Sequence, residues 1–125
     1  MKTLPFAAAL LLACPAPAFA QKAPGKLPPY AESIRCAGLA EAAAKLEPGG
    51  VSAKSASFDA AIFWGMAASE AARKDGLSGE RFTADQVEAA AKADRELRGP
   101  GTDALTELAF CIARVPPLPR KGERG

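Results

Sequence analysis

The sequence predicts an all-α protein, a small four-helix bundle-like domain clamped by one disulfide, with flexible termini. Two observations carry this prediction. Alanine, the best helix former, occurs 30 times among 125 residues, whereas the β-branched residues that sheets prefer are scarce, with three valines, three isoleucines and four threonines. In addition, four segments repeat their apolar residues at helical spacing, and proline or glycine separates most of them from their neighbours.

The first predicted helix runs from Tyr30 to about Leu46, with Pro29 near its first turn and Pro48-Gly49-Gly50 after its end. Its main apolar face is made of Cys36, Leu39, Ala40, Ala43 and Leu46. Tyr30 and Ile34 point away from that face. The helix therefore either touches two neighbours or exposes a second apolar strip.

The second predicted helix spans about Ser57 to Lys74, with Ser55 or Ser57 as its N-cap. Residues 60–68 carry no charge. We expect such a helix to be buried on most sides and to form the centre of the bundle. Trp64 stands beside Phe63 and Met66, an aromatic cluster that fits either a core or the lining of a ligand pocket.

The third predicted helix has the clearest start signal. Thr83-Ala84-Asp85-Gln86 matches a capping box, Phe82 and Val87 occupy the positions of a hydrophobic staple, and the helix continues to Arg98. Its apolar side is thin, which predicts a surface position.

The fourth predicted helix begins at Thr102 or Asp103 and runs to about Val115. Its apolar stripe consists of Leu105, Leu108, Ile112 and Val115, and Cys111 lies beside that stripe.

The N-terminus predicts export. Residues 1–20 combine Lys2, an apolar stretch and a small-x-small end at Ala18-Phe19-Ala20, the pattern of a secretory signal peptide. This predicts a periplasmic or secreted protein. Leu11-Leu12-Ala13-Cys14 resembles the lipobox of bacterial lipoproteins, which leaves lipidation of Cys14 at the envelope as an alternative. In an oxidising compartment the remaining pair, Cys36 and Cys111, implies a disulfide.

The charge distribution separates the body from its ends. Residues 29–115, the predicted helical domain, hold ten Lys and Arg against thirteen Asp and Glu, although the whole chain is at +2. The leader (21–28) and the Pro-rich tail (116–125) are basic. We expect weak contact of these ends with anionic surfaces, no nucleic-acid partner and no transmembrane span in the mature chain.

The sequence contains no histidine, which excludes Ser-His-Asp and Cys-His triads and His-ligated zinc. We therefore predict no enzymatic activity, no metal and no cofactor, and a binding or envelope accessory module with a protein or envelope partner. Tyr30, Ile34 and Trp64 are its candidate interaction surface. In outline, a small exported helical chain with Cys36 and Cys111 is similar to the periplasmic acid-stress chaperones, and this similarity implies a holdase-like alternative.

Overall fold

The computed structural model describes residues 26–117, which form four α-helices and one short 3-10 helix. In chain order these are α1 (Tyr30–Leu46), η2 (Gly50–Ala53), α2 (Ala56–Lys74), α3 (Gly79–Arg98) and α4 (Asp103–Ala113). The predicted all-α class and the four helices are confirmed. The predicted signal peptide with Cys14, most of the leader, and the tail beyond residue 117 lie outside the described residues.

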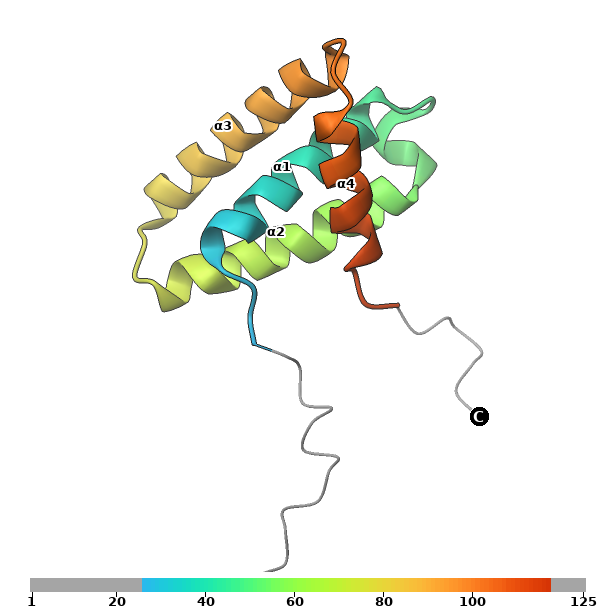
Figure 1. The fold of residues 1–125 in the computed structure, drawn as a ribbon. Helices are drawn as coiled ribbons and strands as arrows, with labels where there is room; N and C mark the ends of the chain where they lie inside the picture. Colours follow the sequence, from blue (N-terminus) through green and yellow to red (C-terminus); the bar gives the residue numbers. More distant parts are fainter. Residues whose placement is uncertain (1–25, 118–125) are drawn as a thin grey trace, which may run out of the picture.

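The helix α1 lies at the centre of the domain. Figure 1 shows α1 between α2 and α3, with α4 crossing it, and α1 contacts each of the other α-helices. Its small residues allow this close packing. A Cβ on Gly38 would lie 2.7 Å from the carbonyl carbon of Ala89, so the backbones of α1 and α3 meet there without an intervening side chain.

The prediction that the second helix forms the centre is wrong. Only one face of α2 is buried, and this face contains Ser57, Ala60, Trp64, Ala67, Ala68, Ala71 and Ala72. On the opposite face, Ile62 is 50% and Met66 is 69% exposed. The reason is that α1 carries small side chains on several sides and accommodates three neighbours, whereas α2 packs mainly on α1.

Serine side chains cap the N-termini of α2 and α3. Ser55 caps α2, because its hydroxyl oxygen accepts a hydrogen bond from the amide of Phe58 at 3.2 Å. The predicted capping box at Thr83 is wrong, since α3 begins more than one turn earlier, where the hydroxyl oxygen of Ser78 accepts a hydrogen bond from the amide of Arg81 at 3.1 Å. The earlier start brings Phe82 into α3, with its ring centroid 6.4 Å from that of Tyr30.

The last helix closes the core. Leu108 of α4 is buried and Ile112 packs against the core, but Leu105, predicted to lie on the same stripe, is 53% exposed. The predicted disulfide between Cys36 and Cys111 is confirmed, and it links α4 to α1 across a sequence separation of 75. Both cysteines are buried. Within residues 26–117, no helix has the length and hydrophobicity that crossing a membrane requires.

Candidate functional site

A groove with a volume of about 280 Å³ runs between α1 and α4, directly beside the disulfide. Eight residues line it: Glu32, Arg35, Cys36, Thr106, Glu107, Phe110, Cys111 and Arg114. This set combines charged side chains with an aromatic ring and the disulfide. The charged side chains decide what chemistry the groove supports.

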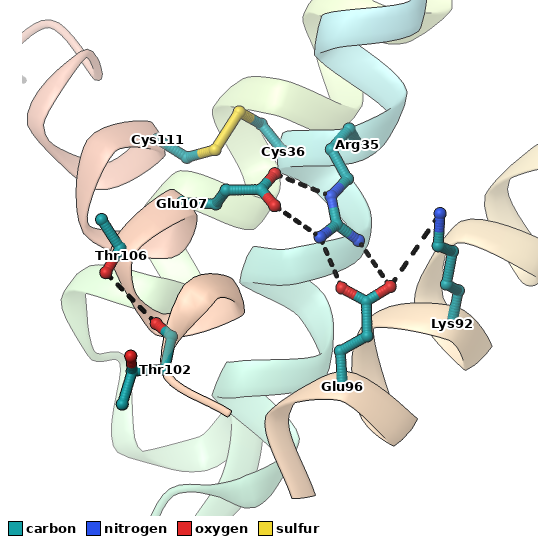
Figure 2. Close-up of polar contacts among 8 residues, drawn as sticks. All are labelled: Arg35, Cys36, Lys92, Glu96, Thr102, Thr106, Glu107 and Cys111. Carbon is teal, nitrogen blue, oxygen red and sulfur yellow. Dashed lines mark hydrogen bonds and ion pairs between the residues drawn. A yellow bond between two sulfur atoms is a disulfide. The ribbon is translucent and has the colours of Figure 1, made fainter. Parts of the chain in front are cut away.

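Arg35 joins three helices at one side of the groove (Figure 2). Its guanidinium donates two hydrogen bonds to Glu107 of α4, at 3.0 and 2.9 Å, and its closest bond to Glu96 of α3 measures 2.6 Å. Lys92 lies 3.9 Å from the same Glu96 carboxylate. These hydrogen bonds, which Arg35 donates and Glu107 accepts, hold the pKa of Glu107 below its usual value and raise the pKa of Arg35.

These pairings limit the acid-base chemistry of the groove. A carboxylate whose pKa is lowered by a bound guanidinium stays ionised at neutral pH and is a weak base. Cys36 and Cys111 are joined in the disulfide and offer no thiolate. Among residues 26–117, no group of three or more His, Cys, Asp or Glu is arranged to hold a metal ion.

Arg114 forms the other side of the groove. Its guanidinium carbon lies 5.0 Å from the ring centroid of Trp64 and 5.3 Å from that of Phe110, and it forms an ion pair with Glu32. Phe110 itself is 63% exposed. The groove therefore has an exposed aromatic ring beside an arginine that is held in place by three neighbours.

The three residues of the predicted interaction surface occupy different environments. Trp64 is 1% exposed, and its indole nitrogen donates a hydrogen bond to the carbonyl oxygen of Cys111, which makes it a core residue and not a surface residue. Ile34 is half-buried. Tyr30 is half-buried as well and donates a hydrogen bond to Asp85 of α3 at 2.7 Å. Burial and this bond raise the pKa of Tyr30 to about 12.

Tyr30 therefore touches a neighbouring helix, which is one of the two outcomes that the sequence left open.

The most exposed large apolar side chains of the described residues lie elsewhere, and they are Met66, Val87, Phe110, Leu105 and Ile62. Sequence reasoning did not place Phe110 at a site. The signal was present, because Phe110 lies about 160° around its helix from Leu108, away from the apolar stripe.

No protein-family model, curated protein or solved structure matches this chain.

Proposed function

We propose that the mature chain is an exported, non-catalytic interaction module that holds an apolar side chain of a partner polypeptide in the α1–α4 groove. The exposure of Phe110 carries this proposal. An exposed phenylalanine gains stabilisation when a partner removes it from water, and aromatic and arginine side chains are the residues that dominate binding energy at protein interfaces.

The surroundings of Phe110 support the same role. The groove beside it has a volume of about 280 Å³, and the disulfide and the Arg35 bonds restrain its two walls. The charges along it are paired with each other, since Glu32 binds Arg114 and Glu107 binds Arg35. An apolar group therefore enters without leaving any of these charges unpartnered.

A photo-crosslinking amino acid placed at position 110 tests this function in the native envelope. We expect a discrete adduct with one partner polypeptide, and we expect the adduct to disappear when Thr106→Trp fills the groove. The same crosslinker at Glu88, an exposed residue of α3 that lies outside the groove, is the matched control. The groove is ruled out as the binding site if adducts at position 110 persist unchanged with Thr106→Trp, or if they equal those at position 88.

Export is supported by the N-terminal signal pattern and by the disulfide, because disulfides persist in oxidising compartments. Anchoring through Cys14 remains the alternative. The intact mass of the protein from its native host distinguishes the two, since cleavage before Gln21 gives an unmodified N-terminus and lipidation adds the mass of acyl chains to Cys14.

A holdase-like stress role is the second candidate, and one observation favours it. The carboxylates of Glu107 in α4 and Asp85 in α3 each accept a hydrogen bond from a residue of α1. Protonation of these carboxylates in acid weakens the bonds and so loosens the contacts of α1 with α3 and α4. This role predicts that the chain suppresses aggregation of a client protein at pH 2–3 and not at pH 7. Equal activity, or none, at both pH values would contradict it.

A further inference from the structure

The outer face of α2 is a second exposed apolar surface, separate from the groove. Ile62 and Met66 are half to two-thirds exposed, and they lie one helical turn apart. We infer that this face binds the α2 helix of a second copy of the chain, in antiparallel orientation about a two-fold axis.

The spacing of the face is that of a helix pair. Asp59, Ile62, Met66, Ser69 and Arg73 follow one another at intervals of three and four residues, the period at which one helix presents a continuous seam to another. All five lie on the side of α2 opposite Trp64, which faces the core. A Cβ added to Gly65, at the edge of this seam, would meet no heavy atom within 4 Å. A second helix therefore has room to approach the α2 backbone.

The charges at the two ends of the seam identify the occupant. Asp59 lies at the N-terminal end and Arg73 at the C-terminal end, with the apolar pair between them. An antiparallel copy in the register that sets Asp59 opposite Arg73 brings Met66 against Met66 of the other chain, with Ile62 one turn away beside the opposite Ser69. A parallel copy would place like charges side by side, which is unfavourable. The seam is therefore complementary to its own reversed copy, as a two-fold interface requires.

The internal pairing of Arg73 does not oppose this arrangement. Arg73 forms an ion pair with Glu70 of its own helix, but both side chains are more than half exposed. Exposed ion pairs of this kind are worth little and exchange readily. Because one helix face is a small interface, we expect a weak dimer that forms at protein concentrations on the order of 100 µM.

Sedimentation velocity of the mature chain, measured from about 5 to 500 µM, tests the inference over the range expected for a small interface. We expect a concentration-dependent shift from monomer to dimer, and loss of that shift in Met66→Glu. Val87→Glu is the matched control, because Val87 is as exposed as Met66 but lies on α3. Helical circular dichroism and Trp64 fluorescence confirm that both variants are folded.

A charge swap tests the orientation. Asp59→Arg and Arg73→Asp should each weaken the dimer several-fold, and the double variant should restore it. A monomer at every concentration overturns the inference, as does a dimer that Val87→Glu dissolves and Met66→Glu does not. Failure of the double swap to restore the dimer overturns the antiparallel arrangement. The groove proposal does not depend on any of these results, because its test uses positions 106 and 110.

Discussion

The indole nitrogen of Trp64 lies 3.0 Å from the carbonyl oxygen of Cys111 and donates a hydrogen bond to it. This bond places the only tryptophan of the chain against the turn of α4 that carries the disulfide. Arg114, one turn further on, covers the indole ring. The fluorescence of Trp64 therefore reports whether α4 stays packed on α1 and α2.

Removal of the disulfide is the first test of stability. The bond closes a loop across 75 residues, for which the chain-entropy model gives roughly 4–5 kcal/mol. We expect Cys36→Ala with Cys111→Ala to lower the free energy of unfolding by about 2–5 kcal/mol. Urea unfolding followed by Trp64 fluorescence measures the loss, and the wild type in reductant should behave like the double variant. An unchanged midpoint in both would show that the helix contacts alone hold α4.

The contact between Gly38 and Ala89 predicts a second effect. A Cβ at Gly38 would meet the backbone of α3 at 2.7 Å, a distance at which the helices must separate. We expect Gly38→Ala to destabilise the domain by about 1–3 kcal/mol, although alanine is the better helix former. Thermal unfolding followed by circular dichroism measures this change.

Gly65→Ala is the matched control for that substitution. It makes the same chemical change within a helix, but the new Cβ would have no heavy atom within 4 Å. We expect it to leave stability unchanged or to raise it by up to about 1 kcal/mol, measured at a concentration where the chain is monomeric. Equal effects at both glycines would contradict the close approach of α1 to α3.

The helix ends were predictable because local residues decide them. Pro48-Gly49-Gly50 and Gly99-Pro100 stop α1 and α3 close to the residues predicted. The start of α3 could not be predicted, since Ser78 and Thr83 are both suitable N-cap residues. The ring contact between Tyr30 and Phe82, which joins distant parts of the chain, accompanies the earlier start.

The choice of the central helix could not be made from the sequence. Helical periodicity gives the phase of an apolar face but not the number of neighbours that cover it. The uncharged segment of α2 resembled a buried core, whereas the small residues of α1 accommodate more helices. The pairing of Arg35 with Glu107 in the groove could not be predicted from the sequence either, because the two residues are 72 positions apart in the chain.

The titration of Tyr30 tests the bond that joins α1 to α3. Tyr30 is the only tyrosine, so tyrosinate absorbance at high pH belongs to it alone. Burial and the bond to Asp85 raise its pKa from 10.0 to about 12. Because the folded pKa is raised, the stability that this group contributes is complete below pH 10 and is lost as the pH rises through about 12.

Asp85→Asn is the informative variant for that titration. It removes the negative charge that disfavours tyrosinate and keeps a side chain of similar size. We expect the pKa of Tyr30 to fall in this variant but to stay above 10.0, because the largest cause of its shift is burial. A titration at the ordinary pKa in the wild type would show that Tyr30 is exposed and not bonded to α3.

Acid should also destabilise the domain, because two carboxylates bond other helices to α1. The pKa of Glu107 is lowered chiefly by the hydrogen bonds from Arg35, and that of Asp85 chiefly by the bond from Tyr30. A carboxylate with a lowered folded pKa contributes stability that is complete above its unfolded pKa, near pH 4, and is lost as the pH falls through the folded value. We therefore expect the urea midpoint to be constant from about pH 7 to 5 and to fall below about pH 4.

Glu107→Gln isolates the contribution of the Arg35 bond to this acid sensitivity. The amide is neutral at every pH, so the variant should be less stable than the wild type at pH 7 and should lose less stability on acidification. Glu88→Gln, on the exposed side of α3, is the control and should follow the wild type. Parallel pH curves for wild type and Glu107→Gln would mean that other carboxylates drive the transition. A smaller loss in Glu107→Gln alone would assign part of the acid response to the attachment of α4 to α1.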